Sequence, residues 1–340
     1  MKSFATIDLT QLQKNARAIK ETLPSSVKFI AVVKADGYGH GASEVANAIY
    51  TLVDEYAVAL LDEGVSLRQA GIDKEVLLLI PPDNFDIERA VRYKLTISLL
   101  DKKQLRRIDS VAKNQGVIAK IALPINTGMN RLGFTPFEIP LILTEIKKLK
   151  NVRLTEVYSH YYKPENDGDR QAQTQIFKDV QRLIKSEFPD VTAHISSSGG
   201  LLKKEYFDAV RVGIMLYGYY PYDVKNPGVK VEPIMSVFAP IVKNRTVDKG
   251  EHVMYGDFLT DDEVKISVIR YGYADGLPRK VVSGQVNCRC MDLTAIKNDT
   301  KNKYFRILFK NAHEIAKKYG TISYDVLTSV AKRAKRVYKQ

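Results

Sequence analysis

Short apolar runs alternate with longer amphipathic segments over the first two thirds of the chain. The apolar runs are rich in β-branched residues, which is typical of buried strands. Eight of them recur at fairly even spacing, at residues 28–33, 56–60, 76–80, 95–98, 117–123, 153–157, 191–195 and 209–212. Helical periodicity occupies the intervals between most of them, at 12–23, 42–52, 138–149 and 171–188.

This alternation predicts the fold class. Eight strands that alternate with helices over about 200 residues are typical of a (β/α)₈ TIM-type barrel. A doubly wound α/β sheet is the alternative, because periodicity by itself does not prove that a sheet closes. The regularity of the eight units favours the barrel.

The pattern changes after Gly218. Residues 219–222 (YYPY) and 226–228 (NPG) form a segment rich in chain breakers. Alternating runs at 234–243, 264–270, 284–295 and 304–309 then predict strands, and helical patterns follow at 312–319 and 323–335. We therefore predict a barrel domain at 1–225 and a mostly-β C-terminal domain at 226–340.

Composition limits the class of protein. The chain has 340 residues, of which 45% are hydrophobic and 27% charged, as in ordinary globular proteins. It contains no run of 18 apolar residues, and its first residues, MKSFATIDLT, lack the apolar region of a secretory signal. We expect a cytoplasmic protein with no membrane partner. Its two cysteines, Cys288 and Cys290, lack the further ligands of a zinc site, so we expect no metal.

The net charge of +13 raises the question of a nucleic-acid partner. The positive charges are scattered, however, and the densest basic run is the terminal segment 331–340. No helix-turn-helix, zinc finger or RNA-binding aromatic motif is visible. We expect no nucleic-acid partner, and interpret the charge as a field that attracts small anions.

Lys34 lies in the segment AVVKADGYGHG at 31–41. It follows an apolar strand and precedes a turn that contains Gly37, Gly39 and Gly41. In a (β/α)₈ barrel the carboxyl ends of the strands form the active-site face. A partly buried lysine there has a lowered pKa and can act as an amine nucleophile. The alternative for an isolated lysine is a solvated position after an edge strand.

Six further segments accompany this one: NTGMNRLGF at 126, EVYSH at 156, RVGIMLYG at 211, YGYADGLPR at 271, MD at 291 and TISYD at 321. Taken together and in this order, the seven segments resemble those of the alanine racemases, which are fold-type III pyridoxal-phosphate enzymes. The resemblance extends over nearly the whole chain.

The resemblance implies an amino-acid racemase that interconverts L- and D-alanine and supplies D-alanine for peptidoglycan. Racemisation needs one base on each side of the α-carbon, while the cofactor, pyridoxal 5'-phosphate, withdraws electrons. Lys34 would bind the cofactor and serve one face. Tyr273 would serve the other face.

The resemblance also assigns residues that bind the cofactor. His160 would lie near the ring. Arg211 would donate to the pyridine nitrogen and, as a permanent cation, keep that nitrogen unprotonated. The phosphate would be held by the side chains of Tyr38, Ser198 and Tyr324 and by the backbone amides of Gly213 and Ile214.

A third set of residues would bind the substrate. Arg131 matches the arginine that positions the substrate carboxylate, for which its bidentate geometry is suited. Met291 and Asp292 match the substrate-side loop. In the family this loop and the residue equivalent to Tyr273 reach the lysine site of the other subunit, which implies a head-to-tail homodimer with shared sites.

The chain departs from the family near Arg131. Many members carry a lysine two residues before the DTGM motif, and its carbamate orients the arginine. Pro124 occupies that position here, and Asn126 replaces the aspartate. We therefore predict no carbamylated lysine. Arg131 is held either by another group, such as Asn126, or less firmly.

Three alternatives remain open. A serine or broad-specificity racemase is one, although the bulky phenol of Tyr324 favours the small side chain of alanine. A decarboxylase of the same fold is another, for which Cys290 would be the relevant cysteine. The third is a non-catalytic pyridoxal-phosphate-binding or regulatory protein, against which the joint presence of Lys34, Tyr273 and Arg211 argues.

Overall fold

Eight parallel strands form the first sheet, and each overlaps one of the apolar runs in the sequence. The computed structural model describes residues 1–255, 260–279, 288–297 and 302–340. The strands lie in the order β8-β7-β6-β5-β4-β3-β2-β9. Their bounds are β2 (Lys28–Val32), β3 (Glu55–Val58), β4 (Val76–Leu78), β5 (Thr96–Ser98), β6 (Ala119–Pro124), β7 (Val152–Tyr158), β8 (Thr192–His194) and β9 (Ala209–Val212).

Backbone hydrogen bonds bring the two end strands of this sheet together. The amides of Asp208 and Arg211 donate to the carbonyls of Ala193 and Ser196 at 2.9 and 3.0 Å. These bonds connect β9 with β8 and its following residues, so the sheet is a nearly closed barrel. The prediction of a barrel rather than an open doubly wound sheet is confirmed.

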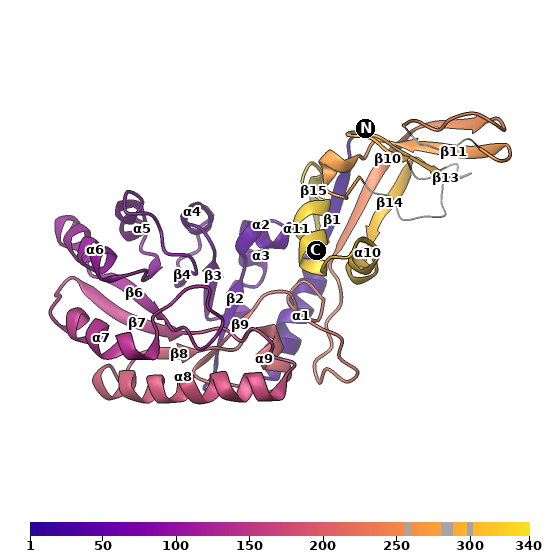
Figure 1. The fold of residues 1–340 in the computed structure, drawn as a ribbon. Helices are drawn as coiled ribbons and strands as arrows, with labels where there is room; N and C mark the ends of the chain where they lie inside the picture. Colours follow the sequence, from indigo (N-terminus) through magenta and orange to yellow (C-terminus); the bar gives the residue numbers. More distant parts are fainter. Residues whose placement is uncertain (256–259, 280–287, 298–301) are drawn as a thin grey trace. The chain divides into compact units, whose positions relative to one another are not determined.

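Helices follow the barrel strands and lie around them (Figure 1). In α6, Asp101 caps the first turn by accepting from the amide of Gln104 at 2.8 Å. Gly116 ends it with a left-handed φ of 67°. The helices that begin or lie in this part of the chain are α1 (Leu9–Glu21), α3 (Ala42–Ala48), α4 (Leu61–Gln69), α5 (Ile87–Arg92), α6 (Lys102–Gln115), α7 (Ile139–Lys147), α8 (Asp167–Glu187) and α9 (Ser198–Leu202).

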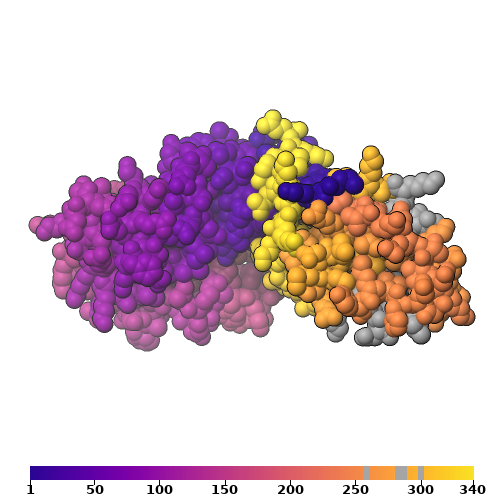
Figure 2. All heavy atoms as spheres, turned by 90° about the horizontal axis from the view of Figure 1, so that it is seen from above, coloured from indigo at the N-terminus to yellow at the C-terminus, as the bar shows by residue number. Residues whose placement is uncertain are grey.

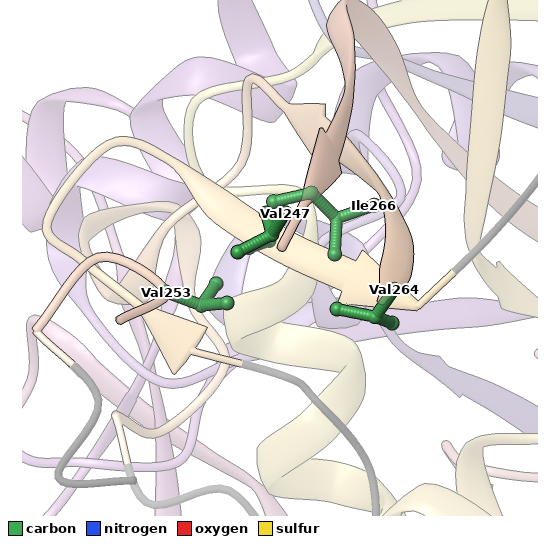
Figure 3. Close-up of a cluster of buried hydrophobic side chains, with 5 residues drawn as sticks. Val247, Val253, Val264 and Ile266 are labelled. Carbon is green, nitrogen blue, oxygen red and sulfur yellow. The ribbon is translucent and has the colours of Figure 1, made fainter. Parts of the chain in front are cut away.

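Within the described residues, a second, mixed sheet of seven strands forms the other unit, with helices α10 (Ala312–Tyr319) and α11 (Ser323–Val330). One hydrophobic cluster of this unit consists of Val247, Val253, Val264, Ile266 and Ala295, which pack toward one another (Figure 3). The predicted mostly-β architecture is confirmed. The strands are β1 (Phe4–Asp8), β10 (Met235–Val247), β11 (Val264–Ile269), β12 (Cys288–Arg289), β13 (Thr294–Lys297), β14 (Tyr304–Phe309) and β15 (Lys335–Lys339).

The N-terminal strand belongs to this second sheet. β1 pairs antiparallel with β10 and parallel with β15. The chain accordingly divides into two compact units, residues 13–37 with 42–231, and residues 1–12 with 38–41 and 232–340. The first residues thus lie outside the unit that holds the barrel. The compact units divide between residues 231 and 232. The predicted domain boundary between residues 225 and 226 stays a prediction.

The basic C-terminal segment is a strand rather than the end of a helix. We predicted a helix over 323–335, but α11 ends at Val330 and β15 follows. In β15 exposed and half-buried side chains alternate with a period of two, and the lysines lie on the exposed face. Figure 2 shows the indigo N-terminal residues against the yellow C-terminal ones.

No helix in the described ranges is both long and apolar enough to cross a membrane.

Two glycines of the second unit provide a matched test of its packing. Gly276 (φ +128°) and Gly250 (φ +84°) both have a positive φ, but a Cβ at Gly276 would lie 1.9 Å from the carbonyl oxygen of Ser329, whereas Gly250 faces open space. We expect Gly250→Ala to lower the free energy of unfolding by about 1 kcal/mol through backbone strain alone. Gly276→Ala should lower it by about 3 kcal/mol or more, because the backbone must also move. Urea denaturation of both variants measures the difference, and equal losses would contradict the packing described here.

Candidate active site

A left-handed turn follows β2 and carries Lys34 at its start. Ala35, Asp36 and Gly37 have φ values of 51°, 52° and 61°, and Tyr38 has a φ of 52°. The glycine-rich turn was predicted, but three of these four residues are not glycine. Each non-glycine residue in this region costs about 1–2 kcal/mol. Surrounding contacts must therefore hold the turn in place.

Glu63, near the start of α4, provides such contacts. Its Oε1 accepts a hydrogen bond from the amide of Ala35 at 2.6 Å. Its Oε2 accepts from the amides of Ala59 and Leu60 at 2.8 and 3.0 Å. Within the turn, Asp36 also accepts from the amide of Ala42 at 2.9 Å. The carboxylate of Glu63 thus connects the turn after β2 with the residues that follow β3.

Lys34 is half-buried at the carboxyl end of β2. Burial lowers the pKa of its amine, and the positive charge of Arg131 lowers it further. The carboxylate of Glu63 opposes this shift, and Arg211 adds a smaller effect that also lowers the pKa. The amine is therefore neutral over a wider pH range than an exposed lysine, as a nucleophile requires.

Arg211 is buried in β9, with 4% of its surface exposed. Its Nη2 donates to the carbonyls of Ser159 and Ile195 at 2.5 and 3.2 Å, and its Nη1 contacts Nδ1 of His194. Burial lowers the pKa of the guanidinium to about 10, which still leaves a cation at neutral pH. Within the described part of the chain, Nε of Arg211 makes no hydrogen bond. That N–H can donate to a ligand.

His160, which follows β7, lies beside these cations. Burial lowers the pKa of its ring to about 3, and the charges of Arg211, Arg131 and Lys34 contribute. The ring is therefore neutral. Nη2 of Arg211 lies 3.3 Å from Nδ1 of His160. Since a guanidinium can only donate, Nδ1 accepts and Nε2 carries the hydrogen.

A group of hydrogen-bond donors lies after the last two barrel strands. The hydroxyl of Ser198 is buried and accepts from the amide of Gly213 at 3.4 Å. Gly213 and Ile214 begin a tight turn after β9, in which the amide of Leu216 donates to the carbonyl of Gly213 at 2.9 Å. Barrels commonly bind phosphate on the loops that follow strands seven and eight, which here are β8 and β9.

Arg131 lies on a loop that is closed at its base by Ile125 and Phe134. Oδ1 of Asn126 accepts from the amides of Gly128 and Asn130, each at 3.0 Å, so Asn126 stabilises the turn of its own loop. Among the residues that the structure describes, neither Asn126 nor any other side chain forms a hydrogen bond or ion pair with Arg131. Of the two arrangements considered, the one in which Asn126 holds Arg131 is wrong.

The remaining predicted residues belong to the second unit. Tyr273 begins the short 3₁₀ segment Tyr273–Asp275, and its amide donates to the carbonyl of Cys290 at 3.0 Å. The next amide donates to the carbonyl of Met291, so Tyr273, Met291 and Asp292 form one cluster. Tyr273 and Met291 are 38% and 55% exposed. Asp292 pairs with Arg333 at 2.9 Å.

Tyr38 and Tyr324 also lie together in the second unit. Their ring centroids are 5.9 Å apart, at an interplanar angle of 51°. Burial raises the pKa of Tyr324 to about 12, so its hydroxyl stays a donor at neutral pH. The two phenols can donate to an anion as predicted, although no contact here tests that role.

Two residues at this end of the barrel were not predicted from the sequence. Glu63 is the third residue of α4. A carboxylate shortly after a predicted barrel strand could have indicated an active-site residue, because the carboxyl ends of the strands form the active-site face. His194 ends β8 and is fully buried. Its contact with Arg211 required the register of β8 and β9, which the sequence does not reveal.

Comparisons with known proteins agree with this arrangement. The family model described as "Alanine racemase, N-terminal domain" matches residues 7–221, and "Alanine racemase, C-terminal domain" matches residues 234–338. An alanine racemase of Clostridium novyi is 33% identical, with 98% of this chain and 95% of that protein covered. One from Thermodesulfovibrio yellowstonii is 35% identical, with 98% and 97% covered. A solved alanine racemase of Clostridium difficile 630 has a TM-score of 0.93 at 30% identity, covering 100% of this chain and 96% of its own.

Replacing Glu63 tests the electrostatics of Lys34. Among the described residues, Glu63 is the carboxylate that raises the pKa of Lys34, and Glu63→Gln removes it, so we expect that pKa to fall further. Labelling with an amine-reactive reagent over a range of pH, with the modified peptide located by mass spectrometry, measures the shift. Asp62→Asn is the matched control, because the neighbouring Asp62 is exposed and pairs with Arg89. Equal labelling profiles for Glu63→Gln and the wild type would contradict the assignment.

Pro124 leads to a prediction about covalent modification. Proline cannot carry a carbamate, and Arg131 has no ionic partner among the described residues, so we expect Arg131 to be active without one. The intact mass in bicarbonate buffer should equal the mass calculated from the sequence. A carbamylated lysine in the density beside Arg131 would contradict this prediction.

Proposed function

Because the chain belongs to the alanine racemase family, we propose that it interconverts L- and D-alanine with pyridoxal 5'-phosphate, using Lys34 and Tyr273 as its two bases. The observation that carries this proposal is the position of Lys34. It lies on a strained turn at the carboxyl end of a barrel strand, with a lowered pKa and two arginines in electrostatic reach.

The residues present fit this cofactor. A phosphorylated pyridine aldehyde needs an amine for its aldehyde, a donor for its ring nitrogen and a group of donors for its phosphate. Lys34 offers the amine, Nε of Arg211 offers an N–H without a partner in the described structure, and the hydroxyl of Ser198, which the amide of Gly213 holds, offers a phosphate donor. When bound, the cofactor withdraws electrons from the α-carbon and makes its hydrogen acidic.

The side chains would then have separate tasks. The amine of Lys34 accepts the α-proton on one face of the substrate. Arg211 donates a hydrogen bond but not a proton, so the ring nitrogen of the cofactor would stay unprotonated. An unprotonated ring would withdraw electrons from the substrate less strongly than a protonated one. Neutral His160 adds no charge beside it. Arg131, which is exposed and unpaired within the described structure, binds the substrate carboxylate.

Tyr273 serves the opposite face, and we propose that it comes from the partner subunit of a head-to-tail homodimer. The exposure of Tyr273, Met291 and Asp292 as one cluster supports this arrangement, since a second copy can cover them. In this dimer Met291 and Asp292 border the substrate. The same assignment places Tyr38 and Tyr324 at the phosphate.

We propose alanine as the main substrate and the cytoplasm as the location, with D-alanine passing to peptidoglycan synthesis. The bulk of Tyr324 favours alanine over serine. A decarboxylase is disfavoured because Tyr273, Met291 and Asp292 are all present, and a non-catalytic protein has no need for a base on each face.

Two variants test the proposed bases. Lys34→Ala should abolish both the visible absorbance of the lysine-bound cofactor and the loss of optical rotation of L-alanine. Tyr273→Phe should slow racemisation by about 100-fold or more, in the range expected for a lost general acid–base group. It should affect the two directions unequally because Lys34 remains. Racemisation at the wild-type rate in Lys34→Ala would refute the mechanism, and near-normal, equal rates in Tyr273→Phe would remove Tyr273 from it.

A further inference from the structure

The interior of the barrel buries two carboxyl groups that have no task in the proposed reaction. Glu55 in β3 is 5% exposed and Glu156 in β7 is 3% exposed. Burial raises the pKa of both carboxyl groups. No donor from the described residues reaches Oε1 of Glu55. A buried carboxyl group that no donor reaches is more stable with a proton than as an anion.

Glu156 is connected to Arg211 through His194. Nε2 of His194 lies 2.8 Å from Oε2 of Glu156, and Nδ1 of His194 is contacted by Nη1 of Arg211. The guanidinium can only donate, so Nδ1 must be the acceptor. Burial, together with the charge of Arg211, lowers the pKa of His194 and keeps the ring neutral. A neutral ring that accepts at Nδ1 carries its hydrogen on Nε2, and Oε2 of Glu156 accepts that hydrogen bond.

The ring of His194 is also fixed in its plane. It stacks on Tyr158 with centroids 5.5 Å apart and an interplanar angle of 4°. The guanidinium of Arg211 lies 5.2 Å from the centroid of the same tyrosine ring. Tyr158 itself is held by the hydroxyl of Ser98 at 2.7 Å. The tautomer of His194, rather than its orientation, is thus what Glu156 controls.

We propose that the buried Glu55 holds a proton, and that Glu156, by accepting at Oε2, fixes the Nε2–H tautomer of His194 and so positions Arg211. Both glutamates and His194 are positioning residues in this account, which rests on the proposed role of Arg211 at the cofactor nitrogen. If Glu156 instead donated to Nε2, the hydrogen of the ring would lie on Nδ1. Two donors would then face each other at Arg211, and its hydrogen bonds would weaken.

The charges of this network balance. Arg211 contributes one positive charge and ionised Glu156 one negative charge, whereas protonated Glu55 and neutral His194 contribute none. The cost of burying a charge is thereby reduced without bringing an anion into contact with Arg211. Other titratable or charged groups also act on the network from neighbouring elements, namely Lys28, Glu75, Arg131, Tyr158 and Asp208.

The tautomer can be measured without cofactor or activity. In protein labelled with ¹⁵N-histidine, the ring nitrogens of His194, assigned by their loss in His194→Asn, should report a neutral Nε2–H ring near pH 7. Glu156→Leu removes the acceptor and should populate the Nδ1–H tautomer. Glu156→Gln keeps a carbonyl oxygen for Nε2–H and should retain the wild-type signals. Glu75→Gln is the control, since it removes a nearby carboxylate that does not bond to His194.

Kinetics of the cofactor-loaded enzyme supply the second readout. Glu156→Leu should lower kcat by about 10- to 100-fold. This range is typical when a residue that orients a functional group through a hydrogen bond is lost. KM for alanine should change less, because Arg211 acts on the cofactor, and Glu156→Gln should restore kcat.

The outcomes separate this inference from the proposed function. If the wild type does not racemise alanine, the proposed function fails, whereas the tautomers still test the network. A charged or Nδ1–H ring in the wild type overturns the inference whether or not any variant folds. Wild-type tautomer and kcat in Glu156→Leu overturn it as well.

Discussion

The carboxylate of Glu63 holds the left-handed turn that follows β2, and the placement of Lys34 depends on that contact. A barrel strand can deliver a lysine to the active-site face, but the chain must then turn without carrying the amine away. Here Ala35, Asp36 and Tyr38 take up conformations that each cost about 1–2 kcal/mol. The hydrogen bond from Ala35 to Glu63 couples this turn to β3, so the rigidity of the barrel fixes the lysine.

The charged residues around Lys34 set the pKa of its amine. Arg131 and Arg211 lower its pKa, and Glu63 limits that effect while it holds the turn. Arg211 is itself a buried cation. Glu156, the group proposed to balance its charge, bonds to His194 and not to Arg211. Positive charge is thereby available to an anionic cofactor and substrate, while the negative charge that stabilises it stays inside the barrel.

The sequence predicted the elements well because the signal was local. Each barrel strand was visible as an apolar run, and the motifs placed Lys34, His160, Ser198 and Arg211 at strand ends. It failed where partners are distant in the chain: β1 pairs with β10 and β15, more than 200 residues away. Positive φ at Ala35 has no sequence signal, since alanine gives no reason to expect it. The sequence showed Glu156 only as part of the motif EVYSH. Its place beside other buried groups was not visible, because residues such as Glu55 lie on other strands.

The central claim is that this strained turn presents Lys34 as the covalent anchor of the cofactor. Borohydride reduction of protein loaded with pyridoxal 5'-phosphate, followed by peptide mapping, tests it most directly. The account predicts that the reduced adduct lies on one peptide, with the added mass on Lys34, and that L-alanine present before reduction diminishes it. An adduct on a different lysine, or labelling spread over many lysines and unaffected by alanine, would contradict the account.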